Sequence, residues 1–159
     1  MTLSAVIIVL REVLEAALLL SLLFSTTRLT GQSNRGIVAG IVLGVAGAVV
    51  VTLLLDTISE GFDGVGQEVF NAVLLSTIVV LLIGYGALLE RRPLTGPAGR
   101  SVLWLVSCMI VTLAITREGM EIIIFSYGFT ANPAELLSVV VGGALGAGIG
   151  ISLGVLIYY

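Results

Sequence analysis

Five long apolar segments alternate with short polar connections along the 159 residues of this chain. In order, they are Leu3–Phe24, Gly36–Leu55, Val69–Leu89, Val102–Phe125 and Leu136–Tyr159. Each has about 20–24 residues, and a helix of that length crosses the ~30 Å hydrocarbon core of a bilayer. None alternates polar and apolar residues as the strands of a membrane barrel do. The pattern therefore predicts an all-α integral membrane protein with five transmembrane helices.

The composition agrees with membrane insertion and narrows the chemistry. Hydrophobic residues make up 58% of the chain and charged residues 11%, with a mean hydropathy of +1.20, whereas a soluble domain is roughly half apolar and about a quarter charged. Histidine is absent, which excludes imidazole catalysis and imidazole metal ligation. The single cysteine, Cys108, cannot form an intrachain disulfide. No nucleophile–base pair or cofactor motif is present, so we expect neither an enzyme nor a nucleic-acid-binding protein.

The connections between the apolar segments alternate in charge. The first and third carry arginines, at Arg28, Arg35, Arg91, Arg92 and Arg100. The second, residues 56–68, has four acidic residues and no basic one, and the fourth has only Glu135. Short arginine-bearing loops stay in the cytoplasm. The pattern therefore predicts a multi-pass protein of the cell membrane with its N-terminus outside and both arginine connections inside.

Two apolar segments contain charged residues where lipid is expected. LREVLEAAL (residues 10–18) and TREGMEIII (residues 116–124) share the pattern R-E-x-x-E. Ionisable side chains inside a membrane are costly, and they face a bundle interior where they pair or line an ion pathway. A helix places the arginine and both glutamates of each motif on one face. The charged residues are Arg11, Glu12, Glu15, Arg117, Glu118 and Glu121.

The two motifs belong to an internal repeat with a constant offset. Arg11 and Arg117 lie 106 positions apart (117 − 11 = 106), and the same offset relates two ladders of small residues at four-residue spacing. The first ladder is Gly36, Gly40, Gly44 and Ala48, and the second is Gly142, Gly146, Gly150 and Gly154. Small residues at this spacing let membrane helices pack closely. A repeat of three segments, an odd number, predicts an inverted second copy, as in many transporters.

The repeat also predicts how the chain is divided. We expect residues 1–92 to form the first three-helix repeat and residues 93–159 the second, inverted one. The third segment of the first repeat begins near Glu68, and its counterpart at position 174 lies beyond Tyr159. The second repeat of this 3+3 architecture is therefore expected to be incomplete. Either the natural chain continues with at least one further span, which is the simpler expectation, or two copies associate as a homo-oligomer.

If the two charged faces meet, four carboxylates and two guanidiniums share one site with a formal charge of −2. Such a site attracts a cation, and its oxygen ligands favour hard cations over soft ones. The arginines would keep the empty carboxylates ionised and oriented until a metal displaces them. The predicted metal ligands are Glu12, Glu15, Glu118 and Glu121, and the predicted counter-ions are Arg11 and Arg117.

One further acid and several functions stay open at this point. Glu68 is an accessory metal candidate, although an acid at a helix N-terminus is favourable without any metal role. The charged motifs suit an inverted-repeat transporter of a hard or heavy cation. They also suit a non-transporting membrane subunit whose charged helices pair with a partner.

The motifs resemble a known family of transporters. LREVLEAALLLSLL and TREGMEIII resemble the paired R-E-G-L-E motifs of the high-affinity iron permeases, which include fungal oxidase-coupled ferric permeases and bacterial iron-uptake permeases. GQEVFNAVLLSTIVVLLIGYGALLERR resembles their third span, and the resemblance covers essentially the whole chain. It implies transport of iron, as Fe³⁺, with the six motif residues in essential roles and no permanently bound cofactor. It also implies an extracytoplasmic oxidase, peroxidase or iron-supply protein as partner. Manganese or lead remain alternative cargoes.

The chain departs from the family pattern in three places. Val13 replaces the usual glycine of the first motif, which tightens the packing there. Asn71 stands where family members often carry a second acid, so an accessory metal role at the head of the third span rests on Glu68 alone. The five predicted spans are also fewer than the family usually has, which suggests a C-terminally incomplete member.

Overall fold

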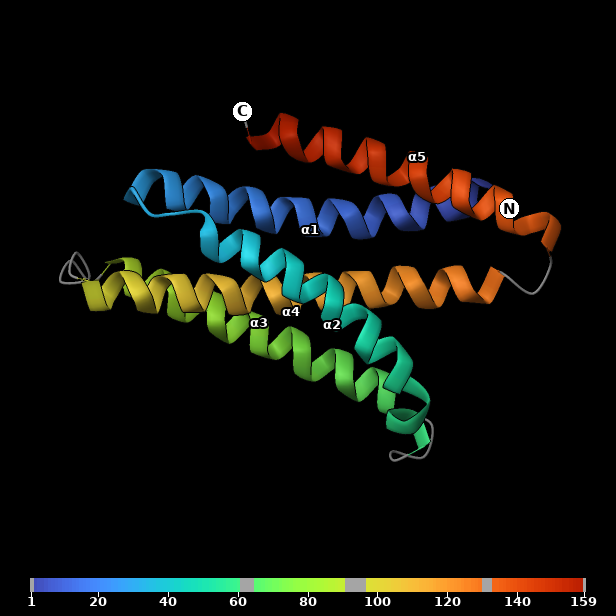
Figure 1. The fold of residues 1–159 in the computed structure, drawn as a ribbon, viewed down its shortest axis with the longest axis horizontal. Helices are drawn as coiled ribbons and strands as arrows, with labels where there is room; N and C mark the ends of the chain where they lie inside the picture. Colours follow the sequence, from blue (N-terminus) through green and yellow to red (C-terminus); the bar gives the residue numbers. More distant parts are fainter. Residues whose placement is uncertain (1, 61–64, 91–96, 130–132, 159) are drawn as a thin grey trace.

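The computed structural model is a bundle of five α-helices, and it describes residues 2–60, 65–90, 97–129 and 133–158 (Figure 1). The helices are α1 (Thr2–Thr30), α2 (Arg35–Glu60), α3 (Gly66–Glu90), α4 (Pro97–Phe129) and α5 (Pro133–Tyr158). Each apolar segment of the sequence lies within one helix, apart from Tyr159, which is outside the described residues. The prediction of an all-α chain is therefore confirmed.

Three helical stretches in the described part of the chain are long and apolar enough to cross a membrane. They are Arg35–Leu54, Gly66–Glu90 and Gly99–Ser126, from α2, α3 and α4. In α5 the described apolar stretch, Val140–Leu153, is shorter, and α1 interrupts its apolar run with the first charged motif. The helices agree with a multi-pass membrane protein, while the number of five spans stays a prediction.

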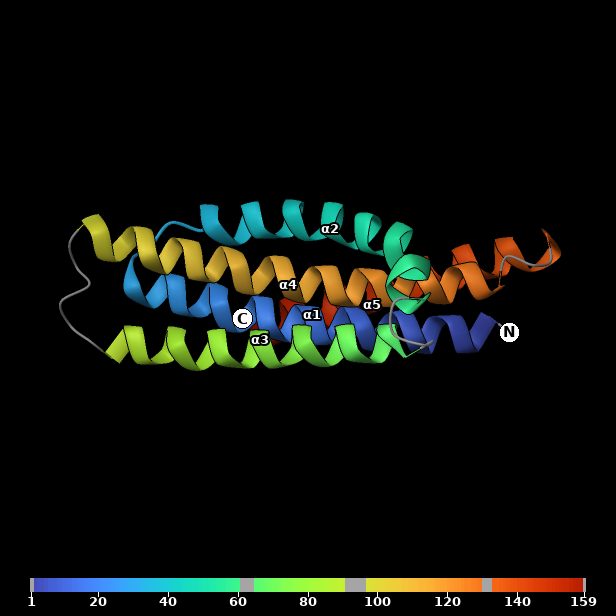
Figure 2. The same cartoon turned by 90° about the horizontal axis from the view of Figure 1, so that it is seen from below.

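The helices run side by side with alternating direction. Figures 1 and 2 show α1, α3 and α5 running one way along the bundle and α2 and α4 the other way. Helix α4 contacts all four of the other helices, and α3 and α5 lie on opposite sides of it. The two motif-bearing helices, α1 and α4, are therefore antiparallel neighbours at the centre of the bundle.

The first glycine ladder lies where α2 packs on α4. A Cβ atom added at Gly40 would lie 2.7 Å from Val111 Cβ, and one at Gly44 would lie 2.6 Å from Ile115 Cβ. At this close approach Thr116 Oγ1 on α4 donates a hydrogen bond of 3.2 Å to the Gly44 carbonyl. The absence of side chains on this face of α2 is what lets the two backbones come so near.

The second ladder lies where α5 packs on α1. A Cβ atom at Gly146 would lie 2.7 Å from the Val6 carbonyl oxygen, and one at Gly150 would lie 2.6 Å from Val13 Cγ1. Gly142 is buried on the same helix, and the surroundings of Gly154 are outside the described residues. Val13, which replaces a glycine in the first motif, thus fills the space that Gly150 leaves. In both halves, the glycine-bearing helix packs on the motif-bearing helix of the other half.

One end of the bundle is fixed by a tight turn and an apolar cluster. Gly31 has a φ of +64° and follows the end of α1, and Gln32 N–H donates to the Thr27 carbonyl across it at 2.9 Å. Thr27 Oγ1 also donates to Asn34 Oδ1 at 2.8 Å, which holds the start of α2 against α1. A buried cluster lies against this end, made of Leu23, Ile37, Tyr85, Leu103, Ile110 and Val111.

Candidate metal centre

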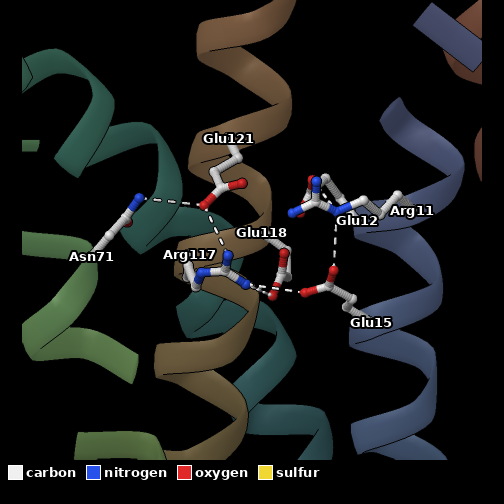
Figure 3. A network of polar contacts seen from close by, with 7 residues as sticks. All are labelled: Arg11, Glu12, Glu15, Asn71, Arg117, Glu118 and Glu121. Atoms are coloured by element: carbon white, nitrogen blue, oxygen red, sulfur yellow. Dashed lines mark hydrogen bonds and ion pairs between the residues drawn. The ribbon is translucent and has the colours of Figure 1, made fainter. Parts of the chain in front are cut away.

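The two charged motifs meet between α1 and α4, away from the ends of both helices (Figure 3). All six charged residues take part in one set of ion pairs and hydrogen bonds, and Asn71 of α3 joins them. We call this set the charged network: Arg11, Glu12, Glu15, Asn71, Arg117, Glu118 and Glu121. The two charged faces, whose meeting was a condition of the predicted cation site, therefore contact each other in the structure.

Arg117 is the centre of the charged network. Its Nη1 atom lies 2.6 Å from Glu118 Oε1 and 3.2 Å from Glu15 Oε2, and its Nη2 atom lies 3.1 Å from Glu121 Oε1. Only 11% of this side chain is exposed. A single guanidinium therefore binds carboxylates of both helices and joins the two motifs, using the planar fork of donors that lysine lacks.

Arg11 occupies the matching position in the first motif but has a different environment. Its Nε atom lies 3.1 Å from Glu15 Oε1 and 3.6 Å from Glu12 Oε1, both on its own helix. The side chain is 63% exposed at the edge of the charged network. The repeat therefore places one arginine inside the network and the other at its open side.

Three carboxylates of the network converge. Glu12, Glu15 and Glu118 each offer one oxygen, and these oxygens all lie within 4.8 Å of one another. We call these three residues the carboxylate cluster. Glu12 and Glu118 are buried, whereas the Glu15 side chain is 43% exposed. Oxygen atoms brought this close repel one another unless a cation or a proton lies between them, and separations of this size allow one ion to bind several of them.

Two oxygens of the carboxylate cluster have no donor. Glu12 Oε2 and Glu118 Oε2 are buried and accept no hydrogen bond from the described residues. Buried polar atoms in folded proteins almost always have a partner, and an exception calls for an explanation such as a missing ion. Together with the convergence of the three carboxylates, these two acceptors identify the place in the network where a cation has ligands available.

Glu121 pairs with the Nη2 atom of Arg117, whereas Glu15 and Glu118 of the carboxylate cluster pair with its Nη1 atom (Figure 3). Its Oε1 atom accepts from Arg117 and, at 3.3 Å, from Asn71 Nδ2 on α3. The Asn71 Oδ1 atom is buried without a hydrogen-bond partner among the described residues. The structure therefore separates the four predicted ligands into a group of three and Glu121, which has an amide neighbour.

The sequence offered Glu68 as a possible accessory ligand from the third helix and gave Asn71 no role in the site. Glu68 is exposed in the first turn of α3, and it forms no ion pair within the part of the chain that the structure describes. Asn71, one turn further on, is the α3 residue that reaches the network. The available signal was an amide side chain inside an otherwise apolar span, because polar residues at such positions usually have a partner or a function.

The network supplies the chemistry of a hard-cation site. Its ligand atoms are carboxylate and amide oxygens, and it holds four carboxylates against two guanidiniums. A cation entering the carboxylate cluster would take over contacts that Arg117 now makes with Glu15 and Glu118. The site can therefore exchange an internal counter-ion for an external one, so that neither state leaves all carboxylates without a positive partner.

Comparison with known proteins gives one finding. The profile of the family described as "Iron permease FTR1 family" matches residues 2–159. No curated protein and no solved structure matches the chain. The matched range includes both charged motifs, both glycine ladders and Asn71.

Proposed function

The chain belongs to the iron permease FTR1 family, and we propose that it transports iron, as Fe³⁺, by binding the ion at the carboxylate cluster. Membership of the family and the long apolar helices make it a multi-pass membrane protein of an iron-transporting class. What the proposal adds is the oxidation state, the place of binding and the way in which the ion is held.

The observation that carries the proposal is the convergence of Glu12, Glu15 and Glu118 from two antiparallel helices. Fe³⁺ is a small, highly charged cation, and it prefers anionic oxygen ligands of the kind that these residues provide. A site inside an apolar helix bundle with surplus carboxylates is costly to build, so it is expected to serve an ion. Glu121 stands outside this group of three, and it is connected to the group through Arg117 and hydrogen-bonded to Asn71.

Arg117 acts in this proposal as the resident counter-ion. Without iron, it holds Glu15, Glu118 and Glu121 through three ion pairs. When iron enters, the guanidinium gives up Glu15 and Glu118 and keeps Glu121, which pairs with its other terminal nitrogen, Nη2. Release reverses the exchange. Because binding and release trade one set of charged contacts for another, neither state is trapped by an unpaired buried charge.

The arrangement of the helices supports an inverted repeat. Helices α1 and α4 run in opposite directions, as do α2 and α5 (Figure 1), and each glycine ladder packs on the motif helix of the other half. Such crosswise packing is what two intertwined, inverted copies of one unit require. In the proposed topology the N-terminus lies outside, and the arginine-bearing connections are inside; Arg35 and Arg100, which flank them, line one cavity.

Uptake of radioactive iron by cells that produce the chain tests this function. We expect Glu12→Gln, Glu15→Gln and Glu118→Gln each to lower uptake at limiting iron by about tenfold or more, the effect of losing about 1.4 kcal/mol of binding free energy. Glu90→Gln, the same change at an exposed acid at the end of α3, is the matched control and should retain normal uptake. Membrane levels of each variant are measured in parallel.

The outcomes separate the alternatives. Normal uptake by a well-expressed Glu15→Gln/Glu118→Gln variant rejects the carboxylate cluster as the binding site. Inhibition by excess Mn²⁺ or Pb²⁺ as strong as inhibition by unlabelled iron assigns the site to another cation. If the chain supports no uptake, and the same variants instead lose a co-purifying membrane protein, the chain is a non-transporting subunit.

A further inference from the structure

A second concave site lies at the end of the bundle that carries the arginine connections. It is a cavity of about 690 Å³ between the turn that joins α1 to α2 and the first turns of α4. Arg35 lines it from α2 and Arg100 from α4, with Gln32, Ser101 and Trp104 around them. It shares no residue with the charged network.

The cavity is electropositive. Two guanidiniums line it, and no lining residue is acidic. Among the described residues neither Arg35 nor Arg100 forms an ion pair. Like charges that line one cavity without an acidic neighbour are favourable only when an anion or water compensates them, and paired arginines suit the oxygens of a phosphate group.

An apolar groove continues from the same arginine along α2. It has a volume of about 660 Å³, shares Ser33 and Arg35 with the electropositive cavity, and extends past Val38, Val42 and Leu43. These three side chains are 54%, 66% and 54% exposed. Val38 and Val42 lie one helical turn apart on the same face of α2, and Leu43 is next to Val42 in sequence. The electropositive cavity and the apolar groove together form a surface that is charged at one end and apolar along the rest of its length.

We propose that this surface binds an anionic phospholipid, with the phosphate between Arg35 and Arg100 and one acyl chain along the α2 groove. The charge of the cavity selects an anion, and the groove selects an anion with an apolar tail. Basic pockets between membrane helices on the arginine-rich side bind anionic headgroups in this way. Trp104, 41% exposed at the rim, has the amphipathic side chain that prefers the headgroup region.

The chain provides its own reporter for a test. Trp104 is the only tryptophan of the sequence and lines the cavity, so its fluorescence responds to what binds there. The full chain in neutral detergent is titrated with phosphatidylglycerol or phosphatidylcholine that carries bromine on its acyl chains, which quenches nearby tryptophan. We expect half-maximal quenching at a several-fold lower mole fraction of phosphatidylglycerol than of phosphatidylcholine.

Charge variants tie this preference to the cavity. In Arg35→Gln/Arg100→Gln we expect the two lipids to quench equally. Arg28→Gln removes an exposed arginine at the same end of the bundle but outside the cavity, and it should keep the preference. Circular dichroism checks the helical content of each variant, and the two single variants, each with a reduced preference, replace the double variant if it does not fold.

Three results would overturn the proposal. The first is an unchanged preference in folded Arg35→Gln/Arg100→Gln, and the second is an equal loss in Arg28→Gln, which indicates a general surface charge. The third concerns the source of the phosphate group. If inorganic phosphate at the concentration of the lipid abolishes the preference in the parent chain, the cavity binds free phosphate and the acyl groove has no role.

Discussion

Arg117 contacts three carboxylates from two helices, whereas Arg11 contacts only the carboxylates of its own helix. The two arginines have the same place in the R-E-x-x-E pattern, so the difference comes from their surroundings. One is enclosed between α1, α3 and α4, and the other lies at the exposed edge of the network (Figure 3). The arginine of the motif therefore has a different role in each copy. Arg117 is an enclosed counter-ion, and Arg11 is a residue at the edge of the network.

Replacing each arginine by glutamine tests this difference. Arg117→Gln leaves the buried Glu118 carboxylate without its cation, and removing one partner of a buried ion pair costs roughly 3 kcal/mol or more. Arg11→Gln removes a guanidinium that is 63% exposed and lies at the longer distance of 3.6 Å from its buried partner Glu12, so it should cost less. We therefore expect a clearly lower Tm in detergent for Arg117→Gln than for Arg11→Gln. Equal Tm values would show that the two arginines are equivalent.

Asn71 is the residue by which α3 joins the network. Asn71→Leu removes the 3.3 Å hydrogen bond to Glu121, and a bond of this type to a charged acceptor contributes about 1.5–3 kcal/mol. We expect lower iron uptake at limiting iron, because Glu121 is no longer held in place. Val69→Leu, at a 40% exposed apolar position on the same helix, is the control. Uptake that falls equally in both variants would assign the effect to α3 packing.

At the scale of the elements, the glycine ladders decide which helices become neighbours. Each ladder gives its helix a flat face. The face of α2 contacts the backbone of α4, and the face of α5 contacts the backbone of α1. Where one motif has Gly119, an alanine of α2 packs on it, and where the other has Val13, a glycine of α5 packs on it. At each contact a residue with a side chain on one helix therefore faces a glycine on the other helix, and this keeps the two membrane helices closely packed.

Two alanine substitutions on α5 test the ladder. A methyl group at Gly146 would meet the Val6 carbonyl at 2.7 Å and Leu10 N at 3.0 Å, both backbone atoms that cannot move without displacing α1. At Gly148 nothing lies within 4 Å. We expect Gly146→Ala to lower the Tm in detergent by several degrees and Gly148→Ala to leave it unchanged. If both variants melt like the parent, the α1–α5 contact does not depend on the ladder.

At the scale of the whole molecule, the charged network and the electropositive cavity occupy different levels of the bundle. The network lies between the middle parts of α1 and α4, and the cavity lies at the end where α2 and α4 begin. Arg35 and Arg100 line one cavity although 65 positions separate them (100 − 35 = 65), so the first turns of α2 and α4 lie at the same end of the bundle. A chain that crosses a membrane back and forth places the starts of every second helix, such as α2 and α4, on the same side.

Cysteine labelling tests the orientation. In a Cys108→Ser background, Arg100→Cys should stay unlabelled by a membrane-impermeant maleimide in intact cells, because its connection is predicted to be cytoplasmic. Asp63→Cys, in the acidic connection outside the described residues, should be labelled. Permeabilised cells provide the control in which both positions react. Labelling of position 100 but not of position 63 in intact cells would reverse the proposed topology.

Much of this arrangement follows from local features of the sequence. The five helices were predicted because apolar runs of sufficient length have few other stable structures in lipid, and the described residues of each run lie within one helix. The R-E-x-x-E motifs predicted charged faces because helical periodicity places residues three and four apart side by side. These inferences need only neighbours along the chain, so the amino-acid order was sufficient for them.

The tertiary structure decided the rest. Nothing in the order of residues shows that α2 packs on α4 and α5 on α1, that Arg117 is enclosed while Arg11 is exposed, or that Asn71 rather than Glu68 reaches the network. Each depends on which surfaces of distant segments fit together. Burial, ion pairing and the choice of helix partner are properties of those contacts, and residues such as Asn71 and Glu121 become neighbours only when the helices pack.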